Sequence, residues 1–153
     1  MTMNDRAVST AVGYALALGI VTLLTIGLVM GFAPLVTGQQ AEATHSTLEV
    51  LGNDLAGDIE RVDHLAAAAG PNGTVVLRSE LPERVGASGY QIEIDETGEN
   101  QRYEIRLRST GPETIATVGF RTGIEIDDTT GTLDGGPLEI RYDGDRLVVS
   151  EDA

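Results

Sequence analysis

The sequence predicts an α+β fold, with a long N-terminal hydrophobic helix and an amphipathic stem helix followed by a small antiparallel β domain. Three observations predict it. Residues 7–41 carry no charged side chain, residues 42–70 repeat apolar side chains at spacings of three and four, and apolar and polar residues alternate beyond Gly73. We therefore expect a hydrophobic helix over 8–38, a stem helix over 42–70 and an acidic β domain over 73–153.

The uncharged run is long enough to span a membrane. It covers 35 residues, and about 20 apolar residues already span a hydrocarbon core of about 30 Å. Backbone groups in lipid must pair with one another, so the run should be helical. A secretory signal has a shorter apolar region, of about 7 to 15 residues, which favours a retained helix over cleavage at Ala41-Glu42-Ala43. Arg6, just before the run, predicts a cytoplasmic N-terminus and a domain outside the cell.

Small residues recur every four positions within this run. Ala11, Ala15 and Gly19 form one series, and Gly27 and Gly31 form another. In lipid, this spacing lets a second helix approach closely. Gly and Ala are also common in membrane helices generally, so the pattern is consistent either with a packing seam between helices or with contact to lipid alone.

The stem helix is predicted from an amphipathic stripe. Its apolar members are Leu48, Leu51, Leu55, Ile59, Val62 and Leu65. The stripe is too short to predict a coiled coil, so we expect it to pack onto the domain that follows. Gly70-Pro71-Asn72-Gly73 should end the helix. Asn72-Gly73-Thr74 is also an N-glycosylation sequon, which an extracellular location would make usable.

The rest of the chain alternates with the period of β-strands. The clearest strands are expected at 90–94, 103–107 and 138–142, and the turn Asp143-Gly144-Asp145 should return the chain into residues 146–150 as a hairpin. Residues 74–78, 114–121 and 123–126 are further candidates. Short strands of this kind predict an antiparallel sheet that is either sandwich-like or wrapped on the stem helix.

Composition limits the choice of partners. The chain has 24 acidic residues against 10 basic ones, all of them Arg, and a net charge of −14. Such a surface repels phosphate backbones, so we expect no nucleic acid partner. It is also typical of adaptation to high salt, where screening weakens self-repulsion. The absence of Cys excludes disulfides, thiolate catalysis and cysteine metal clusters.

Residues suited to catalysis are few and scattered. His45 and His64 lie nineteen positions apart, and neither belongs to an HExxH motif. The sequence has no GxSxG elbow and no GxxxxGK[ST] phosphate loop. Asp127-Asp128, Asp134 and the pair Asp143 and Asp145 are better explained as turn residues than as calcium ligands. We therefore predict that the protein is not an enzyme and has no metal or other cofactor.

The N-terminus resembles a known family. Arg6-Ala7-Val8-Ser9-Thr10-Ala11-Val12-Gly13, followed by the apolar helix, is similar to the start of haloarchaeal type IV pilin-like proteins, over about 30 residues. The resemblance implies that residues 1–7 are a prepilin leader, that Arg6 and Ala7 are recognised by a prepilin peptidase, and that the mature chain begins at Val8. It also implies that the helix stays in the cell membrane and contacts lipid or other pilin-like subunits.

Two functions follow from these observations. The first is a pilin-like cell-surface subunit, structural or assembly-related, that displays an acidic β domain outside the cell, either from the membrane or within a surface filament. The alternative is a monomeric, single-pass anchored domain that binds a ligand or partner without polymerising.

Overall fold

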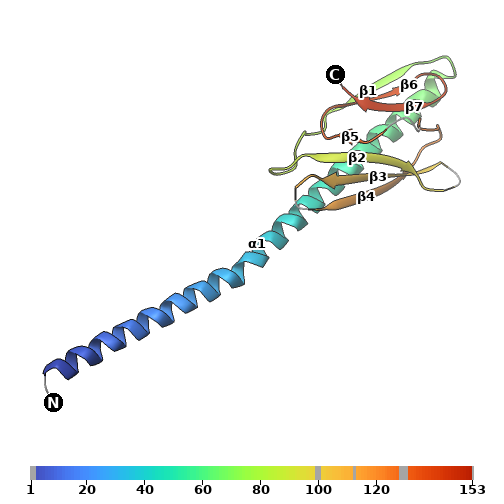
Figure 1. Cartoon of the computed structure of the whole chain (residues 1–153). Helices are drawn as coiled ribbons and strands as arrows, with labels where there is room; N and C mark the ends of the chain where they lie inside the picture. The colour runs from blue at the N-terminus through green and yellow to red at the C-terminus, as the bar shows by residue number, and fades with distance from the viewer. Residues whose placement is uncertain (1–2, 99–100, 112, 128–130, 153) are drawn as a thin grey trace. The chain divides into compact units, whose positions relative to one another are not determined.

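The computed structural model describes residues 3–98, 101–111, 113–127 and 131–152, and it describes side chains from residue 10 onward except those of 32–37. One helix, α1 (Met3–Ala69), precedes all the strands. The strands of the described part are β1 (Val75–Ser79), β2 (Tyr90–Glu96), β3 (Arg102–Ser109), β4 (Ile115–Arg121), β5 (Leu133–Asp134), β6 (Leu138–Tyr142) and β7 (Leu147–Glu151) (Figure 1). The predicted α+β class is confirmed.

The chain consists of two compact units, Met1–Gln40 and Ala41–Ala153. The two helical segments expected from the sequence are successive parts of α1, which continues without a break to Ala69. The helix ends where predicted, because Gly70 adopts a φ of 77° and its N–H donates to the carbonyl of Ala66 at 3.0 Å. A left-handed residue of this kind is most easily provided by glycine.

The predicted stripe of the stem forms one side of the hydrophobic core. Leu48, Leu55, Ile59 and Val62 are fully buried, and Leu51 is nearly so. The inclusion of Leu65 was wrong, because this side chain is 48% exposed and Ala66 is buried instead. A residue four positions after Val62 stays on the buried face, whereas Leu65 and Ala66 are separated by about 100° around the helix.

The second unit contains two antiparallel sheets. One has the order β1-β6-β7 and the other β4-β3-β2-β5. Buried residues of both sheets and of α1 form one hydrophobic cluster, and the last turns of α1 run behind the strands (Figure 1). Of the two arrangements predicted for the strands, the structure has the sheets wrapped on the stem helix.

Close packing of helix and sheet depends on Gly52. A Cβ atom at this position would lie 2.8 Å from Cδ1 of Leu107 on β3 and 2.8 Å from Cγ2 of Val118 on β4. Such distances are shorter than any ordinary van der Waals contact between carbon atoms. Gly52 therefore allows α1 to approach the four-stranded sheet.

Two details of the strand pattern differ from the prediction. Residues 123–126 were expected to form a strand, but Ile126 makes only an isolated bridge with Leu147. The preceding turn is held by side chains, since the Thr122 hydroxyl accepts the N–H of Ile124 and Asp63 of α1 accepts the N–H of Gly123. The two-residue strand β5 was not predicted, because it is too short for alternation to be visible.

Candidate functional site

Most of the exposed large apolar side chains of the described residues lie on the first part of α1. Thr10–Gly31 spans 22 residues with a mean hydropathy of 2.2, and none of it is buried. Within the described chain, this is the one helix that is long and apolar enough to cross a membrane. By length and composition it fits either a membrane span or a signal sequence.

Two hydroxyl groups inside this segment are satisfied by the helix itself. The hydroxyls of Thr22 and Thr25 donate to the carbonyls of Leu18 and Val21, each at 2.8 Å. Hydrogen bonds to the preceding turn remove the cost of placing a hydroxyl in an apolar environment. The two threonines are therefore compatible with a helix surrounded by lipid or by other helices.

The predicted small residues form two patches and not one. At about 100° per residue, the patch of Ala11, Ala15 and Gly19 is centred about 140° around the helix from the patch of Gly27 and Gly31. No atom would lie within 4 Å of a Cβ at any of these three glycines. Both patches are therefore open to contact with a neighbouring helix.

The predicted processing and modification residues lie at the two ends of α1. Arg6, Ala7 and Val8 are helical residues of α1, but their side chains are outside the described part. Asn72 is exposed in the turn between α1 and β1, and Thr74 of the same sequon is exposed as well. The structure thus leaves the Asn72 amide accessible to modification.

The candidate polar residues are not brought together. His45 Nδ1 lies 3.1 Å from the carbonyl oxygen of Ile115 on β4, while His64 is exposed further along α1. Asp143 has the predicted role in a turn, where its carboxylate accepts the N–H groups of Asp145 and Arg146 at 3.4 and 3.3 Å. Across the residues with described placement, no three His, Cys, Asp or Glu side chains gather into a metal-binding group.

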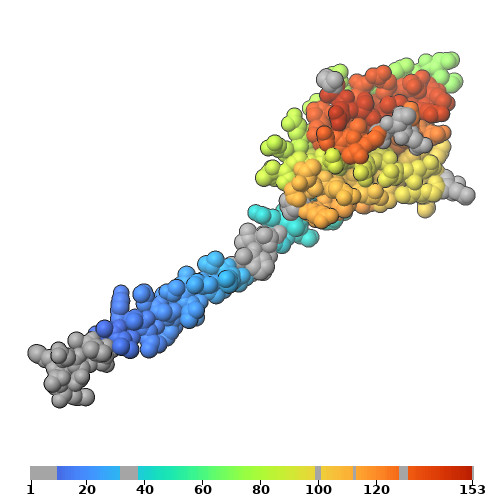
Figure 2. Space-filling model, viewed as in Figure 1, coloured from blue at the N-terminus to red at the C-terminus, as the bar shows by residue number. Residues whose placement is uncertain are grey.

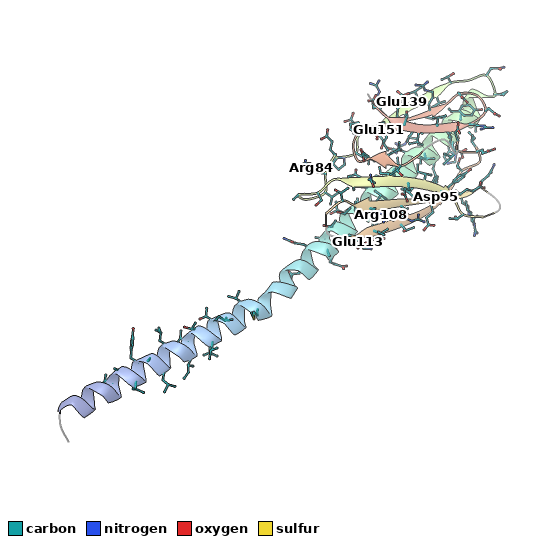
Figure 3. The ribbon with its side chains drawn as sticks, viewed as in Figure 1. Arg84, Asp95, Arg108, Glu113, Glu139 and Glu151 are labelled. Carbon is teal, nitrogen blue, oxygen red and sulfur yellow. The ribbon has the colours of Figure 1, made fainter. Side chains whose placement is uncertain are left out.

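Sequence reasoning missed a concentration of arginines on the four-stranded sheet. The outward positions of β2, β3 and β4 carry Arg102, Arg106, Arg108 and Arg121 together with Glu93, Asp95 and Glu104. This balance contrasts with the net charge of −14 for the chain. The face lies in the yellow and orange part of Figure 2, and Figure 3 labels Arg108 and Asp95 on it.

Only one arginine of this face is in an ion pair within the described residues. Nη1 of Arg106 lies 3.4 Å from Oε2 of Glu93 and 3.3 Å from Oδ2 of Asp95. Arg102 and Arg121 are directly opposite each other in the register of β3 and β4. The alternation on β3 was visible in the sequence, but the pairing with Arg121 depends on a register that the sequence did not provide.

The chain is thus an α+β protein with one N-terminal apolar helix of membrane-spanning length, followed by an antiparallel β domain. The chain belongs to the family of unknown function DUF7266, whose sequence profile matches residues 3–150. No curated protein and no solved structure matches the chain. The matched residues include both the apolar helix and residues of all the described strands.

Proposed function

We propose that this protein is a membrane-anchored, pilin-like subunit of the cell surface, structural or assembly-related, which displays its acidic β domain outside the cell. The observation that carries the proposal is the unburied apolar surface of Thr10–Gly31 on a helix that continues into the domain core. A segment of this kind does not contribute to the core of its own chain. We therefore infer that the apolar segment functions through contacts with lipid or with other protein chains.

The extent of this apolar surface supports a stable contact with lipid or with other helices. Large apolar side chains along the segment are about half to three-quarters exposed, including Leu23 and Met30 at 72% each. Contiguous apolar patches of more than a few hundred Å² are uncommon on soluble monomers and mark membrane or protein contacts. Lipid or neighbouring helices would cover this surface and remove it from water.

The two small-residue patches support assembly with more than one neighbour. A two-helix dimer needs a single close-contact face, whereas a helix packed among several others uses different faces. The patch containing Ala15 and the patch containing Gly27 point in directions about 140° apart. This arrangement suits a subunit that has one neighbour on each side.

The resemblance at the N-terminus supplies the remaining parts of the proposal. A prepilin peptidase would cut between Ala7 and Val8 on the cytoplasmic side, and Arg6 would keep that side in the cytoplasm. The β domain would then lie outside the cell in a high-salt medium, where its negative charge is screened. Membrane lipid, the peptidase and sister subunits are the partners of this proposal.

Mass spectrometry of the N-terminus of protein isolated from native membranes tests the proposal. We expect a mature chain that begins at Val8 and retains the apolar helix. Replacement of Arg6 by Gln should leave the precursor uncut, while replacement of Asn4 by Gln serves as a control next to the junction and should not. An N-terminus at Met1 or Thr2 in the native protein would contradict the pilin-like role.

The alternative is a monomeric anchored domain that binds a ligand or partner without polymerising. The observation that favours it is the arginine-bearing face of β2, β3 and β4, which is a distinctive surface on an acidic domain. This alternative keeps the membrane helix but requires no contact between helices. Cross-linking within the membrane separates the two functions.

A further inference from the structure

We infer that the cleft between Arg102 and Arg121 binds a carboxylate group. The inference rests on the second compact unit alone, Ala41–Ala153, and is independent of the role proposed for the apolar helix. The register of β3 and β4 places the two arginines opposite each other, and both line one cleft. Neither has an acidic partner among the described residues.

The strand register brings the two arginines close together. The N–H of Thr122 donates to the carbonyl of Gln101, which makes these residues a hydrogen-bonded pair in the antiparallel ladder. The next pair, Arg102 and Arg121, is consequently a non-hydrogen-bonded pair. Side chains in such a pair lie on the same face and approach more closely than in the hydrogen-bonded pairs. Two like charges directly opposite each other destabilise the sheet unless an anion lies between them.

Most other arginines of the domain have an acidic partner. Arg61, Arg78, Arg106, Arg141 and Arg146 each lie within ion-pair distance of an Asp or Glu side chain. Within the described part of the chain, neither Arg102 nor Arg121 has such a partner. In a domain with a large excess of acidic residues, two adjacent arginines that lack a carboxylate are an unusual arrangement.

The cleft limits the chemistry of the anion. It has a volume of about 430 Å³, and its lining includes Arg102, Arg121, Glu60 of α1, Tyr103 and Phe120. The rings of Tyr103 and Phe120 stack within the hydrophobic core with centroids 5.7 Å apart and are almost fully buried, so the charged side chains dominate the exposed lining. Two guanidinium groups and one carboxylate leave a single positive charge in the lining. A monoanion matches this charge better than a dianionic phosphate does.

A carboxylate also suits the geometry of the arginines. The planar guanidinium fork donates two parallel hydrogen bonds to a carboxylate, and two forks can share the two oxygens of one group. Glu104 is the next outward residue of β3, but it does not line the cleft. Glu60 of α1 does line the cleft, but it is in ion-pair distance of neither arginine. We therefore expect the bound carboxylate to come from a small free acid or from a side chain of another protein molecule.

Titration of the full-length chain in neutral detergent micelles tests the site. Acetate, phenylacetate, inorganic phosphate and a peptide of ten glutamates are added separately, and the Nε–Hε NMR signals of the arginines are followed. We expect phenylacetate to shift the signals of Arg102 and Arg121 and to bind more tightly than phosphate. Tighter binding of the glutamate peptide than of phenylacetate would identify a protein side chain as the source, and the reverse order would identify a small acid.

Single substitutions locate the binding. R102Q and R121Q should each weaken phenylacetate binding about tenfold, because each removes a charge-assisted bidentate contact. R108Q is the matched control: it removes the same charge from the same face of β3, but Arg108 is opposite Ile115 and not another arginine. Its binding constant should change less than twofold. R121K retains the positive charge but lacks the planar guanidinium group. Its affinity for phenylacetate should therefore lie between the affinities of R121Q and the wild type.

Two results would overturn the inference. One is the absence of any shift of the Arg102 and Arg121 signals with all four probes. The other is an equal loss of binding in R108Q and R121Q, which would indicate general attraction to a basic face. If a variant fails to fold, the thermal unfolding midpoint of the wild type tests the inference instead. Phenylacetate should raise this midpoint, whereas sodium chloride at equal ionic strength should not.

Discussion

The carboxylate of Asp63 on α1 accepts a hydrogen bond from the hydroxyl of Thr122, at 3.1 Å, across 59 positions of the sequence. The same oxygen accepts the backbone N–H of Gly123 at 3.1 Å. Thr122 is buried at the end of β4. This pair of bonds therefore fixes the position of the helix against one end of the four-stranded sheet.

Replacement of Asp63 by Ala should lower the free energy of unfolding by about 1–3 kcal/mol. The substitution leaves the Gly123 N–H without its acceptor and the Thr122 hydroxyl with the carbonyl of Ile124 alone. Hydrogen bonds to charged groups are worth about that amount. Guanidinium denaturation of the detergent-solubilised chain measures the change. Asp58→Ala is the control, since it removes only a surface pair with Arg61 and should cost less than about 0.5 kcal/mol. Equal losses for the two variants would contradict this role of Asp63.

Replacement of Gly52 by Val should destabilise the domain by about 1–3 kcal/mol or more. The added atoms would overlap the side chains of Leu107 and Val118 and push α1 away from the sheet. Gly57→Ala is a matched control on the same helix, because no atom lies within 4 Å of a Cβ at that position. The control should gain about 0.5–1 kcal/mol from its higher helix propensity. A stable Gly52→Val variant would show that helix and sheet are not closely packed here.

Stability should fall at high pH because of Tyr90. Its hydroxyl donates to the carbonyl of Pro82 at 2.7 Å, and burial raises the pKa of Tyr90 from 10.0 to about 12. The raised pKa means that the folded state prefers the neutral phenol. This contribution is complete below pH 10 and is lost as the pH rises through about 12.

The size of this alkaline loss is about 1–3 kcal/mol, from a shift of two pKa units. Denaturation at several pH values between 9 and 12 measures it, and absorbance at 295 nm follows ionisation of the phenols. Tyr90→Phe should lose the hydrogen bond to Pro82 at all pH values but show a shallower alkaline decline. An equally steep decline in this variant would assign the effect to other groups.

Helix contacts should be detectable by cross-linking, because the chain contains no native Cys. Ala15→Cys lies in the first small-residue patch, and Tyr14→Cys is a control at nearly the same depth, about 100° away around the helix. Mild oxidation in native membranes should cross-link Ala15→Cys efficiently and Tyr14→Cys poorly. The double variant Ala15→Cys with Gly27→Cys should give a series of higher oligomers if each subunit has two neighbours. Monomers throughout would favour the anchored-domain alternative.

The periodic elements of the fold could be predicted from the sequence. The core stripe from Leu48 to Val62 repeats often enough to identify an amphipathic helix, and the alternation around Ile92 and Ile105 identifies strands that are buried on one face. The end of α1 was predictable too, since Gly70 occupies the position that a left-handed helix end requires. These features depend on local spacing, which a single sequence contains.

Features that depend on tertiary pairing were not predictable. β5 exists because Leu133 pairs with Ile92. Residues 123–126 form no strand, and their first backbone N–H, that of Gly123, is bonded to Asp63 of α1. The opposition of Arg102 and Arg121 follows from the register of β3 and β4, which a connection between them can set in several ways. From the sequence alone, Gly52 is only a residue of low helix propensity, because its contacts with Leu107 and Val118 are tertiary. The pilin-like N-terminus stays a prediction, because it concerns processing and assembly.

Fractionation of cells that produce the protein naturally tests the central claim, that the apolar helix remains in the mature molecule and holds it in the membrane. After an alkaline carbonate wash, we expect the protein to stay in the membrane pellet and its peptide map to include residues 10–31. Protein that is released into the supernatant and begins near Glu42 would contradict the account.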